Sequence, residues 1–393
     1  MLESWRWFGP DDPVSLENIV QAGAQCVVTS LHHVPTGAAW PAADIDARKR
    51  EIESRGLQWG VVESIPVHNA IKTASGDYQT YIDNYKLSLQ RLGDAGIEVV
   101  CYNFMPVVDW TRPNLDYALP NASRALRFEM TEGVAYDVFI LARAGAAADS
   151  TEGLLDKARQ RHAALSAPDQ ALLERNIIAG LPGGEGSYDR AGIREAIEEF
   201  IALGEEGLRQ NLFRFLEEVI PVAEAAGIRM CIHPDDPPFS LFGLPRVVST
   251  AEDARRILEA VPSLANGLTM CAGSYGARAD NDLVAMVQEF GPRVHFVHLR
   301  NIVREPDGSF YESEHLEGDN DIVGLVNALL AEECRRRKAG RTDAIPMRPD
   351  HGHLMGDEIG REDINPGYSF GGRMKGLAEL RGVIHALETV RRA

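Results

Sequence analysis

The stretch Ala344-Ile345-Pro346-Met347-Arg348-Pro349-Asp350-His351-Gly352-His353 decides the fold. An apolar run leads directly into charged and imidazole side chains, which is typical of a buried strand that releases its last side chains into a site. A carboxylate and two imidazoles within four residues can act as metal ligands and as proton-transfer groups. A polar surface turn would look the same if this cluster stood alone.

Three earlier apolar segments end in the same way. They are Met230-Cys231-Ile232-His233-Pro234-Asp235, Leu268-Thr269-Met270-Cys271-Ala272-Gly273 and Val294-His295-Phe296-Val297-His298-Leu299-Arg300. The repetition favours a functional site over a chance polar turn. We predict that four strand ends meet around one ion.

Eight short and mostly apolar segments read as strands, and a helical pattern follows each of them. The predicted strands are 5–8, 26–31, 58–63, 98–104, 228–233, 268–271, 294–299 and 344–350. Such strands are typical of parallel sheets that are covered on both faces. Eight βα units predict a (β/α)8 TIM barrel that forms one domain over residues 1–393. An open doubly wound sheet is the alternative, which the absence of a GxGxxG loop after the first strand weakens.

The βα rhythm breaks once, between residues 109 and 187. Segments 154–165 and 169–179 look helical, and Pro and Gly lie between or after them. We interpret 109–187 as a large helical insertion after the fourth strand that serves as a lid or as an oligomer contact. A helix over 194–226 with an interruption near Gly204 and Gly207 is expected next. Residues 301–319 are expected to form a polar loop.

Composition narrows the class of protein. Of the 393 residues, 45% are hydrophobic and 25% are charged, as in ordinary soluble globular proteins, and the formal net charge is −18. An acidic chain has no general attraction for phosphate backbones or anionic lipid, so we expect neither nucleic acid nor membrane partners. Five scattered cysteines without a CxxC, and an amino terminus unlike a signal peptide, predict a reducing cytoplasmic location.

Side-chain alternation selects the ligands within the strands. In a TIM barrel the site lies at the carboxyl ends of the strands. His298 shares a face with Phe296 and lies nearer the carboxyl end than His295, so we prefer His298 as the ligand and expect His295 in the core. His233 is likewise terminal, and Cys231 on the same face is expected to pack inside the barrel.

The predicted metal ligands are His233, Cys271, His298 and Asp350. A thiolate, two imidazoles and a carboxylate suit Fe²⁺, Mn²⁺ or Zn²⁺ better than Mg²⁺ or Ca²⁺. Four protein ligands could close a structural site, but an ion with five or six ligands leaves room for substrate oxygens. The number of titratable groups expected nearby favours catalysis. The candidate substrate-binding residues are His32, His33, Asn103, Arg300, Arg348, His353, Arg373 and Lys375.

Four parts of the sequence resemble the mannonate dehydratase family of xylose-isomerase-like barrels. They are Trp5-Arg6-Trp7-Phe8-Gly9-Pro10 with Leu31-His32-His33-Val34-Pro35, then Tyr102-Asn103-Phe104-Met105-Pro106-Val107-Val108-Asp109-Trp110, Pro349-Asp350-His351-Gly352-His353, and Gly367-Tyr368-Ser369-Phe370-Gly371-Gly372-Arg373. The resemblance extends nearly from end to end. It implies conversion of D-mannonate to 2-dehydro-3-deoxy-D-gluconate and water by a homo-oligomer, a dimer or a tetramer.

The resemblance also implies roles for individual residues. The family's His, Cys, His and Asp ligands for Mn²⁺ or Fe²⁺ fall on His233, Cys271, His298 and Asp350, and no organic cofactor is implied. Its proton-transfer residues fall on His351 and Tyr368.

The chemistry of dehydration agrees with these residue types. The reaction removes the weakly acidic proton next to a carboxylate and expels a β-hydroxide, so it needs a Lewis acid, a base and an acid. His351 and Tyr368 are suitable acid–base types, and the sequence leaves open which is which. Arg300, Arg348 or Lys375 could hold the carboxylate of the substrate.

Three other functions remain open. A metal-dependent sugar isomerase or epimerase on the same fold would produce a different sugar and no keto-deoxy acid. A metal-dependent phosphodiesterase or DNA-repair barrel usually needs a metal cluster and a basic groove, and the net charge of −18 argues against it. A non-catalytic sugar-acid sensor would bind its ligand without turnover.

Overall fold

A closed barrel of eight parallel strands forms the centre of the molecule in a computed structural model that describes residues 1–178 and 190–392. In barrel order the strands are β1 (Leu2–Arg6), β12 (Pro346–Arg348), β9 (Val294–His298), β8 (Asn266–Cys271), β7 (Arg229–Ile232), β4 (Val99–Tyr102), β3 (Gln58–Glu63) and β2 (Cys26–Thr29). The predicted (β/α)8 TIM barrel is therefore confirmed.

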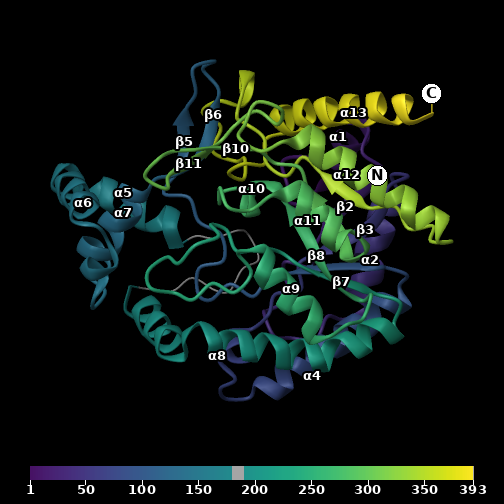
Figure 1. The fold of residues 1–393 in the computed structure, drawn as a ribbon, viewed down its shortest axis with the longest axis horizontal. Helices are drawn as coiled ribbons and strands as arrows, with labels where there is room; N and C mark the ends of the chain where they lie inside the picture. The colour runs from purple at the N-terminus through teal and green to yellow at the C-terminus, as the bar shows by residue number, and fades with distance from the viewer. Residues whose placement is uncertain (179–189, 393) are drawn as a thin grey trace.

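Helices cover the outside of the barrel (Figure 1). The helices that lie between barrel strands or after the last one are α1 (Leu16–Gln21), α2 (Ala42–Glu53), α3 (Asn69–Thr73), α4 (Tyr78–Asp94), α8 (Arg190–Ala225), α9 (Ala251–Ala260), α10 (Ala272–Tyr275), α11 (Leu283–Phe290), α12 (Ile322–Lys338) and α13 (Phe370–Arg392). Short 3-10 helices are η3 (Gly291–Arg293) and η4 (Gly356–Glu358). The interruption expected in the long helix occurs at Gly204, whose φ of 71° is incompatible with a continuous α-helix.

Alternation along the strands fills the barrel interior. Val28, Val61, Val99, Cys101, Cys231 and Phe296 form one buried cluster, so Cys231 packs inside the barrel as expected. The ring of Phe296 lies edge-on to that of His298, with ring centroids 4.6 Å apart. His295 points to the opposite side, where its Nε2–H donates to the carbonyl of Leu264 at 2.7 Å. Closer to the carboxyl ends of the strands than this apolar cluster, the inward side chains lie at the open end of the barrel where a site is expected.

A second, antiparallel sheet is attached to the barrel. Its strands occur in the order β10 (Ile302–Arg304), β11 (Phe310–Glu312), β6 (Arg124–Phe128) and β5 (Asn114–Ala118), and Figure 1 shows them close together. The polar loop expected at 301–319 is thus wrong in part, because it contains the β10–β11 hairpin. Strand pairing joins this hairpin to the β5–β6 hairpin, which lies far away in the sequence.

The segment after β4 is only partly helical. It opens with the β5–β6 hairpin and continues with α5 (Met130–Ala135), a π-helical turn η1 (Tyr136–Ile140), a 3-10 helix η2 (Ala146–Asp149), α6 (Glu152–Ala164) and α7 (Ala167–Ile178). The last two agree with the helices expected at 154–165 and 169–179. The remainder of the expected insertion, from 179 to 187, lies outside the described residues.

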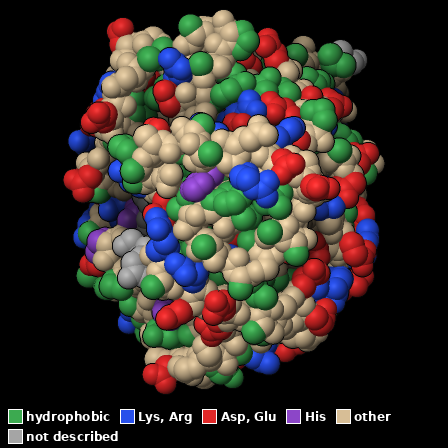
Figure 2. Space-filling model, turned by 90° about the vertical axis from the view of Figure 1, so that its left-hand side faces the viewer, with side chains coloured by type: hydrophobic (Ala, Val, Ile, Leu, Met, Phe, Trp, Pro, Cys, Tyr) green, Lys and Arg blue, Asp and Glu red, His purple; other side chains and the backbone are tan. Residues whose placement is uncertain are grey.

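None of the helices in the described residues is long and apolar enough to cross a membrane. Figure 2 views the molecule from the side of α5, α6 and α7, and acidic and basic side chains are interspersed on that face.

Candidate active site

Strand register brings three predicted site residues to one level at the carboxyl end of the barrel. Cys271 at the end of β8 pairs with His298 at the end of β9, and His298 pairs in turn with Arg348 at the end of β12. His233 directly follows β7, the neighbour of β8. The ends of four adjacent strands therefore surround one position.

The side chains of His233, Cys271 and His298 can converge on one ion. One ligand atom from each of the three lies within 4.8 Å of the others. The Nδ1–H of His233 donates to the carbonyl of Pro234 at 2.7 Å, which leaves Nε2 as its ligand atom. Neither ring nitrogen of the buried His298 has a hydrogen-bond partner in the described part of the chain. Such unsatisfied nitrogens fit an ion as the missing partner.

Asp350 lies beside this group. Its Oδ2 is 3.9 Å from the Sγ of Cys271 and 3.8 Å from Nδ1 of His298. The φ of Asp350 is 68°, a left-handed conformation that side chains with a Cβ seldom adopt and that Asp tolerates better than most. A strained backbone here is consistent with a functional demand on the position of this carboxylate.

Both acidic groups of the cluster are held in their charged forms. Burial alone would raise the pKa of the Cys271 thiol, but the positive charge of Arg300 and the contact with His233 lower this pKa well below its ordinary value. Burial likewise opposes ionisation of Asp350, and Arg348 and nearby imidazoles outweigh it, so the pKa of this carboxyl is also well below normal. A thiolate, a carboxylate and two imidazoles fit a divalent ion.

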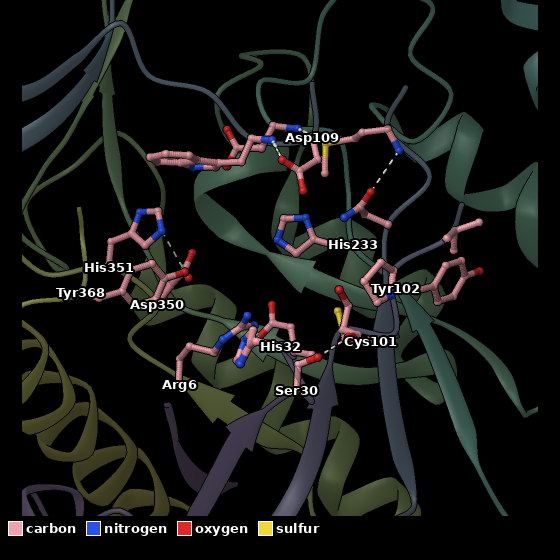
Figure 3. Close-up of a pocket in the computed structure, with 18 of the residues that line it drawn as sticks. Arg6, Ser30, His32, Cys101, Tyr102, Asp109, His233, Asp350, His351 and Tyr368 are labelled. Carbon is pink, nitrogen blue, oxygen red and sulfur yellow. Dashed lines mark hydrogen bonds and ion pairs between the residues drawn. The ribbon is translucent and has the colours of Figure 1, made fainter. Parts of the chain in front are cut away.

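A cavity opens next to this group (Figure 3). His351, Asp350 and Tyr368 lie on one side of it, Tyr102 and Cys101 lie on the other, and His233 lies between them. Of the predicted substrate-binding residues, the wall contains His32, Asn103, Arg300 and Arg348.

His32 is a neutral hydrogen-bonding group on the cavity wall. Burial, with the nearby charges of Arg6 and Arg48, lowers the pKa of His32 to about 3. Neither of its ring nitrogens has a hydrogen-bond partner among the described residues. One nitrogen of a neutral imidazole donates and the other accepts, so His32 can form a hydrogen bond with a hydroxyl group as donor or as acceptor.

Two predicted substrate-binding residues lie on the outer surface. The cavity wall, as far as residues 1–178 and 190–392 form it, includes neither His33 nor Lys375. His33 is exposed and its Nε2 lies 2.9 Å from Asp44. The Nζ of Lys375 is 2.5 Å from Glu314. Each is already paired with a surface carboxylate, and neither supports the substrate role predicted for it.

His353 and Arg373 are buried, and the wall formed by the described residues includes neither of them. The Nε2–H of His353 donates to the backbone carbonyl of Glu312 at 3.0 Å. Arg373 donates to the carbonyls of Arg6 at 2.7 Å and Tyr368 at 2.8 Å. These contacts give both residues a structural role that fixes the backbone next to the cavity.

Arg300 is enclosed by carboxylates. Its guanidinium lies 2.6 Å from Asp236, 2.7 Å from Glu312 and 3.2 Å from Asp350. These carboxylates leave few of its donors for a substrate, whereas its charge still acts on the cluster. Arg300 is therefore better placed to orient the acidic groups than to clamp a substrate carboxylate.

The sequence prediction missed a buried ion-pair group formed by Arg6 and Glu63. Glu63 lies 2.9 Å from Arg348 and 3.1 Å from Arg6, and these arginines outweigh its burial and lower its pKa to about 2. Arg6 and Glu63 are the last residues of β1 and β3. The rule that strand ends face the site would have found Glu63, whereas Arg6 was missed because the first strand was predicted at 5–8 and ends at Arg6.

Asp236, Glu312 and Lys72 were also missed. Asp236 pairs with Arg300 and lies in the loop that follows β7. Its place shortly after a strand end could have identified it as a candidate site residue. Lys72 lies on the cavity wall and donates to the carbonyl of Met105 at 3.0 Å. Glu312 lies in β11, outside the barrel, and no barrel pattern could have identified it.

The two proposed proton-transfer residues lie side by side. The rings of His351 and Tyr368 are 5.0 Å apart and nearly perpendicular, and both side chains line the cavity. Gly352 and Tyr368 form a bridge between their backbones, which ties the loop of Tyr368 to the end of the β12 segment. Burial raises the pKa of Tyr368 to about 12, so its hydroxyl stays protonated near neutral pH.

Comparison with known proteins gives one consistent result. The family model described as D-mannonate dehydratase (UxuA) matches residues 1–393. The chain is 67% identical to "Mannonate dehydratase" from Saccharophagus degradans over 393 residues, which cover 100% of this chain and 99% of the relative. It is 57% identical to "Mannonate dehydratase 2" from Agrobacterium fabrum over 99% of this chain and 98% of that one.

A solved structure agrees with this result. The crystal structure of mannonate dehydratase from Streptococcus suis serotype 2 superposes with a TM-score of 0.79 at 34% identity, covering 100% of this chain and 94% of that one. The similarity thus extends from sequence to fold over the full length. This chain belongs to the D-mannonate dehydratase family.

Proposed function

We propose that this chain is a hydro-lyase that removes water from D-mannonate and forms 2-dehydro-3-deoxy-D-gluconate. Membership of the family supports the reaction. The observation that supports it most directly is the proximity of His351 and Tyr368 to a His-Cys-His group that can hold a divalent ion. A Lewis-acid position and two acid–base groups are the parts that such an elimination requires.

His233, Cys271, His298 and Asp350 would hold the ion in the proposed enzyme. When bound, a divalent ion stabilises the negative charge that develops on the substrate carboxylate as the α-proton leaves. We propose Mn²⁺ or Fe²⁺, the ions that the resemblance to the family implies, and a ligand set that mixes thiolate, imidazole and carboxylate is compatible with them. No organic cofactor is needed for a β-elimination of this kind. A reducing cytoplasm would keep the Cys271 thiolate intact.

Side chains on the cavity wall would hold the substrate and move its protons. The buried Nε of Arg348 has no hydrogen-bond partner among the described residues, so it can donate to a substrate oxygen. His32 and Asn103 are suited to the hydroxyls of the sugar chain. His351 and Tyr368 would exchange protons with the α-carbon and the departing hydroxyl, one as the base and the other as the acid.

The proposal predicts that the purified protein forms a keto-deoxy acid from D-mannonate and that chelation abolishes this activity. Because the ion supplies the charge stabilisation, activity should return on addition of Mn²⁺ or Fe²⁺, and addition of Zn²⁺ provides a comparison. A coupled assay for 2-dehydro-3-deoxy-D-gluconate measures both effects. Formation of a ketose from an aldose, without a keto-deoxy acid, would instead identify an isomerase. Binding of mannonate without turnover would identify a sensor.

We also propose that the segment after β4 covers the cavity. Asp109, Trp110 and Ile178, which lie at the two ends of its described part, are on the cavity wall. We expect mannonate to slow limited proteolysis within residues 109–178, because a segment that closes on substrate loses mobility. Equal cleavage with and without mannonate would contradict a substrate-linked lid. Light scattering on the same samples would then test the alternative role as the contact of a dimer or tetramer.

A further inference from the structure

Glu312 binds His351 with both carboxylate oxygens. The Nδ1 of His351 lies 2.7 Å from Oε1 and 2.8 Å from Oε2 of Glu312. Both side chains are buried, with 3% and 4% of the surface of Glu312 and His351 exposed. The contact is therefore shielded from water, where a charge-assisted hydrogen bond is stronger than at the surface.

This contact determines which ring nitrogen of His351 carries the proton. A carboxylate can only accept, so Nδ1–H donates to Glu312 and Nε2 keeps its lone pair. The Nη1 of Arg300 lies 3.1 Å from the same Nδ1, but it has Glu312 as an acceptor at 2.7 Å. The opposite tautomer would place the lone pair of Nδ1 against the carboxylate.

The surroundings of His351 fix the plane of its ring. Trp110 and Tyr368 lie edge-on to it, with centroid distances of 5.7 and 5.0 Å. Glu312 is fixed in turn by the guanidinium of Arg300 at 2.7 Å and by that of Arg112 at 3.6 Å. Burial would raise the pKa of Glu312, but the hydrogen bond from His351 and the positive charge of Arg300 lower it and keep the carboxyl charged.

The second sheet carries Glu312 to this position. Within β11, Phe310 pairs with Phe128 of β6, and Glu312 pairs with Ile302 of β10. The phenyl rings of Phe310 and Phe128 stack with their centroids 5.7 Å apart. A sheet built from two distant hairpins thus places one carboxylate next to a barrel histidine.

We propose that Glu312 is a positioning residue that holds His351 in the tautomer and orientation needed for proton transfer in the dehydration, a role that rests on the function proposed above. Glu312 is not on the cavity wall that the described residues form. Arg300 and Arg112 hold its carboxylate in place, and we assign its effect on the reaction to the contact with the imidazole of His351. A carboxylate that merely stabilised the β10–β11 hairpin would affect folding, and it would not affect the proton on His351. The two roles therefore predict different results for an isosteric change.

Glu312→Gln tests the proposal, because it keeps the shape of the side chain and removes its charge. We expect kcat with D-mannonate to fall about ten- to a hundredfold, the range that loss of an orienting partner produces for metal-bound histidines. KM and metal content should change little, since the substrate and ion sites are not altered. Glu312→Asp, which keeps the carboxylate, should retain more of the rate and provides a second variant if Glu312→Gln folds poorly.

Glu332→Gln is the matched control. Glu332 is also buried and bound to a guanidinium, that of Arg336 at 3.0 Å, but it lies in α12 and not on the cavity wall. Its substitution should cost stability without the selective loss of kcat. Wild-type kcat in Glu312→Gln, or an equal loss in both variants, would overturn the proposal.

Proton NMR separates this proposal from the proposed function. In protein loaded with diamagnetic Zn²⁺, the Nδ1–H of His351 should give a strongly downfield resonance that disappears in His351→Asn. This resonance should move upfield in Glu312→Gln and remain unchanged in Glu332→Gln. If the resonance shows these changes but the protein forms no keto-deoxy acid, the proposed dehydratase function is wrong, and the hydrogen bond from His351 to Glu312 is still supported. If the resonance is unchanged in Glu312→Gln, the positioning role is wrong whatever the reaction.

Discussion

Replacing Tyr368 with Phe should lower the turnover of D-mannonate about a hundred- to ten-thousand-fold, the usual contribution of a positioned acid or base. The substitution removes one hydroxyl and keeps the ring that packs edge-on against His351 and Phe8. Metal content and mannonate binding should remain, because the proposed ligands and the rest of the cavity wall are unchanged. Steady-state kinetics, elemental analysis and calorimetric binding of mannonate measure the three quantities.

Tyr136→Phe controls for the loss of a buried hydroxyl as such. Tyr136 is also fully buried, its hydroxyl has no partner among the described residues, and it does not line the cavity. We expect near wild-type turnover in this control, and a loss of similar size in His351→Asn. Wild-type turnover in Tyr368→Phe would remove the tyrosine from the mechanism and leave His351 with another proton donor.

Cys271→Ser should lower metal affinity at least tenfold to a hundredfold. Loss of a residue that only supports a metal ligand already has an effect of that size, and Cys271 is a proposed ligand itself. The reason is that a serine hydroxyl remains protonated where the Cys271 thiol is held as a thiolate. Activity should fall with metal occupancy and recover in part at high metal concentration. Elemental analysis after dialysis, and turnover as a function of added Mn²⁺, measure the effect.

Cys231→Ser is the matched control for this substitution. Cys231 is equally buried, one strand away on β7, and its thiol donates to the carbonyl of Val100 at 3.6 Å. Its serine variant should keep its metal. A folded Cys271→Ser protein with full metal content would show that the proposed ligand set is wrong.

The barrel and the position of its site could be predicted because both follow from local sequence patterns. Each strand is a short apolar run, and β3 was located with its correct bounds, whereas the ends of β4 and β12 were placed too far out. Alternation of side chains along one strand was enough to assign His298 to the site and His295 to the opposite face. Alternation could not be applied immediately beyond the strand ends, because the chain turns there. Both His32 and His33 were therefore predicted to bind substrate, whereas His32 lies on the cavity wall and His33 is exposed.

The second sheet and Glu312 could not be predicted, because neither is determined locally. β10 and β11 contain three residues each, too few for a clear alternation, and their surroundings are polar. Their pairing partner is a hairpin in a segment that was interpreted as helical. The backbone contacts of Arg373 and His353 could not be predicted for a related reason, since sequence cannot show that a polar side chain is already bound to backbone carbonyls.

The pairing of β6 with β11 also has a consequence during synthesis of the chain. Roughly 180 residues separate the two strands, and at about 5–20 residues per second the ribosome needs on the order of ten to forty seconds to make them. Throughout that interval the edge of β6 has no partner and could pair with another nascent chain. Arg124 and Arg127 place two positive charges on this five-residue strand. Like-charge repulsion between copies then disfavours aggregation until β11 emerges and completes the sheet.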